Sequence, residues 1–180
     1  DTRAAVKEQI ESLGARFVEM ELPKDAETAS GYAKEMSPEF IKKEMEAIGS
    51  RLPRTDVVIS TALVFGKKAP LLITEEMVKT MREGSVIIDI AAEQGGNCEL
   101  TQPDEVVQKY GVTIYGPANL PASLPLHASQ MYARNIANLV KHLYQAKDRQ
   151  LNFTDEITRS SCVCRNGELV SETVKSIFSK

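Results

Sequence analysis

Three short segments of small residues follow stretches of the sequence that have the composition of buried strands. They are Thr61-Ala62-Leu63, Ala91-Ala92-Glu93 with Gly95-Gly96-Asn97, and Pro117-Ala118-Asn119-Leu120. In an open parallel sheet, ligands bind outside the carboxyl ends of the strands, and small residues let a flat ligand approach the backbone closely. Such segments also occur where a chain only turns tightly, so each one alone leaves both interpretations open. Three of them in one sheet favour a nucleotide pocket.

A different kind of chemistry, by nucleophile or metal, has little support in the sequence. His127 and His142 do not stand at metal-ligand spacing from any cysteine. No Ser, His and Asp constellation indicates nucleophilic catalysis. We therefore predict no catalytic side chain and no metal ligand.

Asp1 directly precedes a helical pattern in which Val6, Ile10 and Leu13 share one face. In dinucleotide-binding sheets an acidic residue at the end of the second strand accepts hydrogen bonds from the adenosine ribose. A plain helix N-cap is the simpler interpretation of this aspartate taken alone. The G-x-G-x-x-G fingerprint that precedes such an acidic residue does not occur in the sequence.

Helical and strand patterns alternate from residue 3 to about 115, which is typical of an α/β fold. The apolar runs 56–62 and 86–91 are continuous rather than alternating, as in parallel strands that are covered on both faces. We expect a doubly wound parallel sheet with right-handed crossovers. The predicted helices span 3–13, 37–51, 74–82 and 103–110, and the predicted strands span 15–20, 56–62, 86–91 and 112–115.

The pattern changes after the stiff loop 119–125. A long helix is predicted from about His127 to Ala146, and a hairpin from Ile157 to Val170 around an Asn166-Gly167 turn. The core candidates of the long helix are Ala128, Met131, Ala137, Val140 and Leu143. We expect residues 1–126 to form a Rossmann-like cofactor-binding domain that lacks its first strand–helix unit. Residues 127–180 would form a connecting helix and a segment that returns to a second domain.

The overall composition excludes several classes of protein. With 42% hydrophobic residues, the chain of 180 residues is an ordinary globular sequence rather than a disordered or collagen-like one. The net charge of −3 argues against a nucleic-acid partner. No apolar run is long enough for a membrane span, and three cysteines favour a reducing compartment. Because the chain opens directly on a helical pattern without a leader, we expect a fragment that starts inside a fold.

Four longer motifs resemble the NAD(H)-binding component, the alpha subunit, of proton-translocating NAD(P) transhydrogenase. The likeness covers essentially the whole chain, and the motifs occur in the family's order. They are Asp1-Thr2-Arg3-Ala4-Ala5, Ser30-Gly31-Tyr32-Ala33-Lys34-Glu35-Met36, Thr61-Ala62-Leu63-Val64-Phe65-Gly66-Lys67-Lys68-Ala69-Pro70 and Asp89-Ile90-Ala91-Ala92-Glu93-Gln94-Gly95-Gly96-Asn97-Cys98.

The resemblance implies a protein that holds NAD(H) for direct hydride transfer to NADP(H) on a partner component, coupled to proton translocation. The family's component is a homodimer that works with NADP-binding and membrane-spanning components. It is peripheral on the inner membrane and faces the bacterial cytoplasm or the mitochondrial matrix. Transfer between two nicotinamides needs positioning and exclusion of water more than a general acid or base.

The resemblance also implies cofactor-binding residues. Asp1, Thr2 and Arg3 match the segment that holds the adenosine ribose, and Gly31 and Tyr32 with Met36 match a mobile loop that closes over the nucleotide. Glu44 matches a polar contact position on the next helix. The strand-end contacts are Thr61, Ala62 and Leu63, and those nearer the nicotinamide are Gly95, Gly96, Asn97 and Asn119, with Leu120 beside it.

Two other interpretations of the sequence stay open. The first is a soluble enzyme similar to alanine dehydrogenase, a family that has an aspartate where Glu93 stands and lacks the Gly31-Tyr32-Ala33-Lys34 lid. The second is a non-catalytic module that only dimerises or docks on a partner. The family's glycine fingerprint and its Arg/Gln/Asp loop are absent from this sequence, so we expect the chain alone to bind NAD weakly and to be inactive.

Overall fold

The computed structural model of the chain describes residues 6–19, 38–64, 66–144 and 150–178. Six predicted cofactor-binding residues lie outside these ranges: Asp1, Thr2, Arg3, Gly31, Tyr32 and Met36. The chain divides into two compact units, residues 1–120 and 121–180. The predicted division at residue 126 follows from a second domain of a larger subunit, and it stays a prediction.

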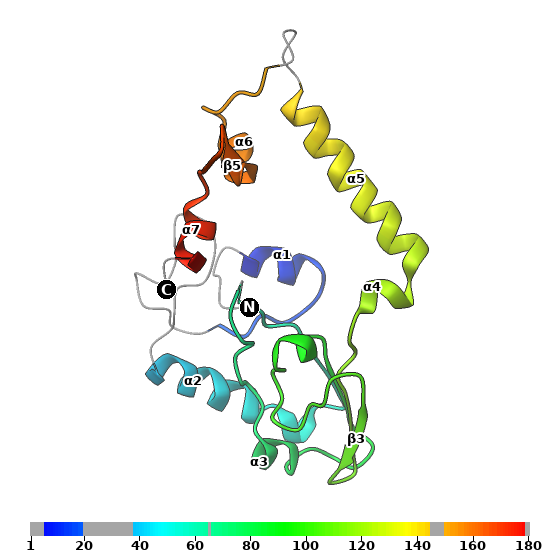
Figure 1. Cartoon of the computed structure of the whole chain (residues 1–180). Coiled ribbons are helices and arrows are strands. Elements are labelled where there is room, and N and C mark those ends of the chain that lie inside the picture. The colour runs from blue at the N-terminus through cyan, green and yellow to red at the C-terminus, as the bar shows by residue number, and fades with distance from the viewer. Residues whose placement is uncertain (1–5, 20–37, 65, 145–149, 179–180) are drawn as a thin grey trace. The chain divides into compact units, whose positions relative to one another are not determined.

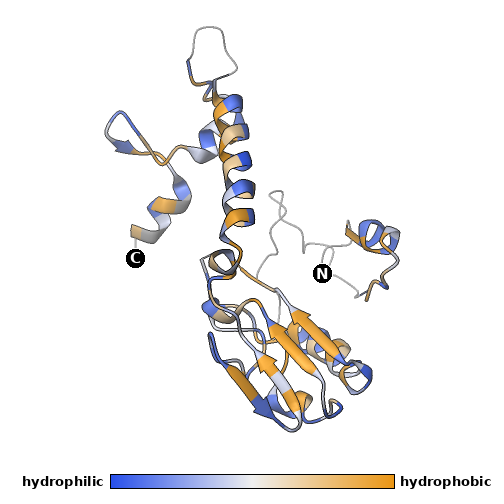
Figure 2. Cartoon of the chain, turned by 90° about the vertical axis from the view of Figure 1, so that its right-hand side faces the viewer, coloured by the Kyte–Doolittle hydropathy of each residue, from blue (hydrophilic) through white to orange (hydrophobic). Residues whose placement is uncertain are grey.

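The first unit is built on a four-stranded sheet with the strand order β1-β2-β4-β3. The strands β1 (Val57–Ser60), β2 (Val86–Asp89) and β4 (Val112–Tyr115) are parallel, and β3 (Val106–Lys109) pairs antiparallel with β4. Figures 1 and 2 show these strands, which are mostly apolar, side by side in the lower part of the molecule. The three predicted parallel strands are therefore confirmed.

One face of this sheet carries the core of the unit. Ile87, Val112 and Ile114 are fully buried on it and pack against Val78 of α3 (Glu75–Val78) and Leu52 of the 3-10 helix η2 (Leu52–Arg54). Ile48 of α2 (Pro38–Gly49) adds to the same cluster. The helix α2 begins at Pro38, one residue after the predicted Ser37, and α3 begins after Thr74, whose hydroxyl accepts a hydrogen bond from the Met77 N–H.

The opposite face of the sheet is more open than the sequence predicted. Val57 and Ile59 of β1 point away from the core cluster and are 58% and 63% exposed. The expectation that both faces of this strand are covered is therefore wrong for the part of the chain that the structure describes. The physical reason is that β1 is an edge strand, and the described elements that pack on the sheet cover the other face.

The predicted helix over residues 103–110 is wrong, because this segment contains β3, the first strand of a hairpin with β4. Lys109 pairs with Val112, and the intervening Tyr110 and Gly111 have φ of 56° and 74°. Two left-handed residues form the tight turn that joins strands with the natural twist. The glycine at this position closes a hairpin rather than ending a helix.

The predicted strand over residues 15–20 is also wrong in its described part. Residues 15–19 follow α1 (Lys7–Ser12) as irregular chain. Two neighbouring apolar residues, Phe17 and Val18, bury too little surface to hold a strand without a partner. The helix predicted ahead of them is confirmed in α1, although it is shorter than residues 3–13.

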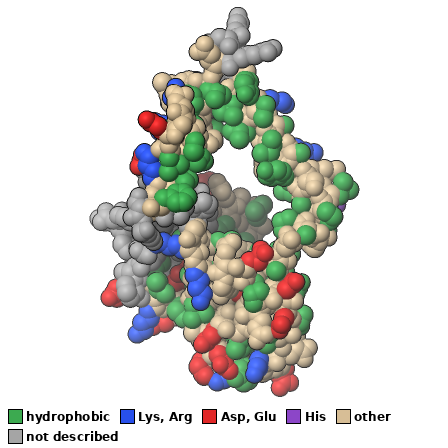
Figure 3. Space-filling model, in the orientation of Figure 1, with side chains coloured by type: hydrophobic (Ala, Val, Ile, Leu, Met, Phe, Trp, Pro, Cys, Tyr) green, Lys and Arg blue, Asp and Glu red, His purple; other side chains and the backbone are tan. Residues whose placement is uncertain are grey.

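The second unit contains α5 (Pro125–Leu143), which follows the short helix α4 (Leu120–Ser123) and matches the predicted long helix. Its core candidates Ala128, Met131, Ala137, Val140 and Leu143 are exposed or half-buried, with Met131 68% exposed, so the prediction that they form a core is wrong within this chain. The described residues leave this apolar stripe largely uncovered, and Figure 3 shows it as green side chains on the helix. None of the described helices is both long and apolar enough to cross a membrane.

The predicted C-terminal hairpin is confirmed in its second half. The strands β5 (Cys164–Arg165) and β6 (Glu168–Leu169) flank Asn166 and Gly167, which have φ of 52° and 83°. Residues before this hairpin form α6 (Glu156–Ser161) instead of the predicted strand, and α7 (Glu172–Phe178) follows. The reason for α6 is the N-cap Asp155, whose carboxylate accepts a hydrogen bond of 2.7 Å from the Thr158 N–H.

The cap residue Asp155 also joins α6 to α5. The Nε2 of His142 lies 2.8 Å from Oδ2 of Asp155. Since a carboxylate only accepts hydrogen bonds, Nε2 is the nitrogen that carries the hydrogen. This contact, followed by the hydrogen bonds from Thr158, lowers the pKa of Asp155 from 3.8 to about 2.

We expect a measurable pKa of about 2 for Asp155, and a value much closer to 3.8 in the variant His142→Ala. Because the folded pKa is depressed, the cap stabilises the unit fully above the unfolded value of 3.8, and that stabilisation is lost as the pH falls through about 2. Carboxyl chemical shifts followed by NMR titration give the pKa directly. The matched control Thr158→Val keeps the backbone donor and removes the hydroxyl, so its effect should be smaller. An unchanged pKa in His142→Ala would contradict the assigned contact.

Candidate functional site

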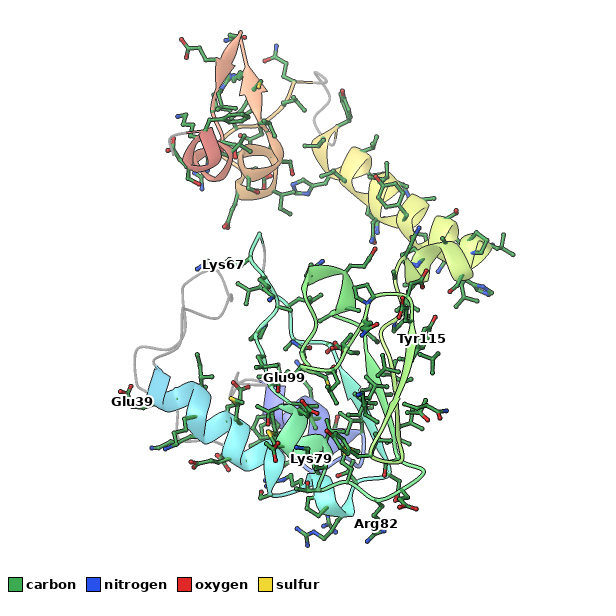
Figure 4. All side chains as sticks on the ribbon, turned by 60° about the horizontal axis from the view of Figure 1, so that its bottom comes forward. Glu39, Lys67, Lys79, Arg82, Glu99 and Tyr115 are labelled. Carbon is green, nitrogen blue, oxygen red and sulfur yellow. The ribbon has the colours of Figure 1, made fainter. Side chains whose placement is uncertain are left out.

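The carboxyl ends of β1, β2 and β4 meet at one edge of the sheet because the three strands are parallel neighbours. The segments that leave this edge are Thr61–Leu63, the turn around the 3-10 helix η3 (Ala92–Gln94), and Gly116–Leu120. Figure 4 labels Lys67 on the loop after β1 and Tyr115 at the end of β4 on this side, with Arg82 on the opposite side. The predicted strand-end residues therefore lie along one edge.

A buried carboxylate occupies the centre of this edge. Asp89, the last residue of β2, is 0% exposed and accepts two hydrogen bonds at Oδ1 and three at Oδ2 from the described residues. A buried charge is tolerated only where donors replace the lost water. The donors are the Ser60 Oγ at 3.0 Å and the Ala91 N–H at 3.1 Å on Oδ1, and the Asn97 N–H at 2.7 Å, the Cys98 N–H at 3.0 Å and the Thr101 Oγ1 at 2.7 Å on Oδ2.

The side chain of Asn97 is bound to the backbone of two neighbouring segments. Its Oδ1 accepts a hydrogen bond of 2.9 Å from the Ala62 N–H, and its Nδ2 donates to the Ala62 carbonyl at 2.9 Å and to the Pro70 carbonyl at 2.8 Å. Its own carbonyl accepts from the N–H groups of Leu72 and Ile73. The amide thus pairs with Ala62 much as a neighbouring strand would.

The two glycines before Asn97 are required by the chain's own packing. Gly95 and Gly96 have φ of 100° and 75°, a region that other residues rarely adopt. A Cβ at Gly96 would lie 2.9 Å from Oδ2 of Asp89, and one at Gly95 would lie 2.5 Å from Cε of Lys68, whose stem crosses the glycine. The signal that pointed to close approach by a ligand therefore has a second cause.

The end of β4 packs closely against η3. A Cβ at Gly116 would lie 2.9 Å from the Ala92 Cβ and 2.6 Å from the Thr101 Cγ2. Beyond it, Asn119 has φ of 48° and is exposed, as is Leu120. These two predicted residues thus lie on the exposed side of the same edge.

Two ionisable groups near these elements have shifted pKa values. Burial raises the pKa of the Cys98 thiol, which therefore stays protonated and packs as an apolar group. Burial likewise raises the pKa of Glu44, which is half-buried on α2. Among the described residues, no group of three His, Cys, Asp or Glu side chains is arranged to hold a metal ion.

The structure brings together Thr61, Ala62 and Leu63 with Asn97 through the paired amide, and Gly96 with Asp89. Glu44 lies on α2, apart from this hydrogen-bonded group in the contacts that the structure records. Sequence reasoning missed Asp89, Ser60 and Thr101 as site-forming residues. The available signal was a charged residue inside the apolar run 86–91, because a buried carboxylate must be surrounded by donors.

The mixed, mainly parallel sheet with its helices, and the small residues at its carboxyl edge, define a Rossmann-like α/β domain. The family described as "Alanine dehydrogenase/PNT, C-terminal domain" matches residues 1–172. The chain belongs to this family.

Relatives in this family cover nearly the whole chain. The first of the parts that make up NAD(P) transhydrogenase subunit alpha in Rhodospirillum rubrum is 49% identical over 174 residues, which are 94% of this chain and 45% of that protein. The solved structure of the transhydrogenase from Sinorhizobium meliloti covers 94% of this chain with a TM-score of 0.70 and 34% identity, and 44% of that chain is covered. A structure of L-alanine dehydrogenase covers 75% of this chain and 38% of its own, with a TM-score of 0.54 and 29% identity. The chain thus spans about half the length of the transhydrogenase relatives that it matches.

Substitution of the two adjacent glycines separates the cost of backbone conformation from the cost of disturbing Asp89. Gly95→Ala should cost about 1 kcal/mol of unfolding free energy, because the flexible Lys68 stem moves aside and only the left-handed backbone is strained. Gly96→Ala should cost about 3 kcal/mol, since its methyl group also displaces a carboxylate that is fixed by its donors. Urea unfolding of the purified variants measures the difference. Equal losses would show that the carboxylate network contributes nothing at Gly96.

Proposed function

We propose that this chain binds NAD(H) at the carboxyl edge of its parallel sheet, as part of an NAD(P) transhydrogenase. The dinucleotide would be held there for direct hydride transfer to NADP(H) on a partner component, coupled to proton translocation. The observation that carries the proposal is the identity of 49% to a transhydrogenase subunit over 94% of the chain. The likeness to L-alanine dehydrogenase covers less of the chain at a lower TM-score.

The exposed residues at this edge fit a flat, partly apolar ligand. Leu63 is 49% exposed although it is apolar, and the exposed Thr61 offers a hydroxyl beside it. Asn119 and Leu120 add an amide and an apolar side chain beyond β4. An apolar surface with a few polar groups that fix orientation is the usual composition of a cofactor site.

The residues at this edge would act by binding and orienting. When bound, the reduced nicotinamide supplies the hydride, and its ring is oxidised as the NADP ring is reduced. Thr61, Ala62 and Leu63 would contact the cofactor beyond β1, while Gly95, Gly96, Asn97, Asn119 and Leu120 would form the wall nearer the nicotinamide. Contact with apolar side chains excludes water, which protects a hydride from competing reactions.

The proposal extends to residues outside the described ranges and to Glu44. Asp1, Thr2 and Arg3 would hold the adenosine ribose, and Gly31, Tyr32 and Met36 would belong to a loop that closes over the nucleotide. A homodimer, a peripheral location on the inner membrane, and contacts with NADP-binding and membrane-spanning components form part of the same proposal. The fragment by itself is expected to be inactive.

The variant Leu63→Ala tests the site directly. Loss of an apolar contact should raise the Kd for NADH about fivefold to tenfold in the assembled protein. Leu71→Ala is the matched control, because Leu71 is also a half-exposed leucine, at 42%, but lies beyond the loop that leaves β1. Fluorescence titration with NADH measures both. Equal Kd values for the two variants and the unaltered protein would remove Leu63 from the site.

The reaction itself distinguishes the proposal from an enzyme of the alanine dehydrogenase type. The assembled protein should reduce an NADP+ analogue with NADH, and it should not reduce NAD+ with L-alanine. Both reactions are followed by absorbance in the same preparation. Alanine-dependent reduction of NAD+ without transfer between nicotinamides would favour the alanine dehydrogenase alternative. Binding of NADH with neither reaction would favour a module that only docks.

A further inference from the structure

We infer that Asp89 and Asn97 are positioning residues that set the conformation of the segment after β1 without touching the cofactor. This inference rests on the proposed function, and it assigns Asn97 a different role from the direct contact expected of it. The basis is that the polar atoms of both side chains are already bound to the chain's own groups.

The first step concerns the atoms available for a ligand. Asn97 is 0% exposed, its Oδ1 is paired with the Ala62 N–H, and its Nδ2 donates to two carbonyl groups. An amide nitrogen has two hydrogens to donate. Both are used, so a cofactor could be bound by Asn97 only after Ala62 or Pro70 is released.

The second step concerns what the pairing does to the segment after β1. The neighbouring strand β2 ends at Asp89, and the Ile90 N–H still donates to the Ser60 carbonyl at 2.9 Å. Two residues further along from Ser60, the Asn97 amide takes over as the partner of Ala62. Because successive residues of an extended chain point to opposite sides, holding Ala62 inward leaves Thr61 and Leu63 outward, and both are exposed.

The third step concerns the loop between Ala62 and Pro70. Asn97 Nδ2 binds the carbonyl groups at both ends of this loop, so one side chain closes its neck. The Ala69 N–H donates to the Gln94 carbonyl at 2.7 Å and strengthens the same closure. Figure 4 shows Lys67 on this loop. The ends of the loop are therefore fixed by the turn that carries Gly95 and Gly96.

The fourth step links this closure to Asp89. Oδ2 of Asp89 accepts the Asn97 N–H at 2.7 Å, and Oδ1 accepts the Ser60 hydroxyl at 3.0 Å. One carboxylate therefore holds both Asn97 and the last residue of β1. A rigid supporting shell of this kind keeps contact residues in the geometry that binding requires.

The test compares two buried serines at opposite edges of the sheet. Ser60→Ala removes the hydroxyl that joins β1 to Asp89, whereas Ser85→Ala removes a hydroxyl ahead of β2 whose acceptor is the Thr55 carbonyl at 3.4 Å. In the assembled transhydrogenase, Ser60→Ala should raise the KM for NADH about fivefold, the equivalent of roughly one hydrogen bond, and leave kcat and the KM for NADP+ unchanged. Ser85→Ala should change none of these values.

The KM-against-kcat split separates positioning from a general loss of structure. A merely structural defect lowers the amount of active enzyme, and therefore kcat, without changing the KM for NADH. Asn97→Ala should raise the same KM by about tenfold or more, because Ala62 and Pro70 both lose their partner. If Asn97→Ala yields no folded protein, Ser60→Ala decides the question.

Equal KM values for NADH in Ser60→Ala and Ser85→Ala would overturn the inference. If the unaltered protein shows no saturation with NADH at all, the proposed function fails instead. The two failures are therefore distinguishable in one experiment.

Discussion

The buried carboxylate of Asp89 is the constraint on which the functional edge of the sheet depends. It lies on the same face of β2 as the buried Ile87, at the place where the apolar core ends. A charge at this depth is strongly unfavourable unless its oxygens are fully hydrogen-bonded. The donors come from β1, from the residue before η3, and from residues 97–101. Satisfying one carboxylate thus brings three separate segments to one point.

The two edges of the sheet are consequently held by different forces. At the amino edge the polar contacts are exposed, as in the pair of Arg82 and Asp56 at 3.7 Å, and exposed pairs contribute little to stability. At the carboxyl edge the polar contacts are buried, and no buried side-chain nitrogen or oxygen in the described residues lacks a partner. Hydrogen bonds are directional, so the carboxyl edge is defined more narrowly in geometry than packing of apolar groups alone would achieve. This is the edge at which a ligand has to meet fixed contacts.

The sequence predicted the parallel strands correctly because apolar runs of strand length are produced by burial itself, as in Val86-Ile87-Ile88. It failed at residues 103–110, where the glycine at 111 was interpreted as the end of a helix. The structure uses that glycine together with Tyr110 in a hairpin turn, and a left-handed tyrosine leaves no compositional signal. The strand edge of the site could be predicted for the same reason as the strands, since parallel neighbours end on one side. The roles of individual residues were harder to predict, because a Gly-Gly-Asn sequence is compatible with an amide that binds a ligand and with one that binds the backbone. Asp89 was visible as a charge within an apolar run, but its donor Ser60 lies 29 residues away along the chain, and such a partner cannot be identified from local pattern.

This division between buried and exposed residues bears on how one family can include both transhydrogenase and alanine dehydrogenase. The polar atoms of Asp89 and Asn97 are bound within the chain, so their arrangement is compatible with either reaction. Both reactions move a hydride to or from a nicotinamide and require the dinucleotide to be fixed at the same kind of edge. The choice of the second substrate must therefore be made by groups that remain accessible, such as Leu63, Glu93 and Asn119, and by the parts of the protein that face them. A buried shell that fixes the edge leaves those exposed positions open to change without loss of the fold.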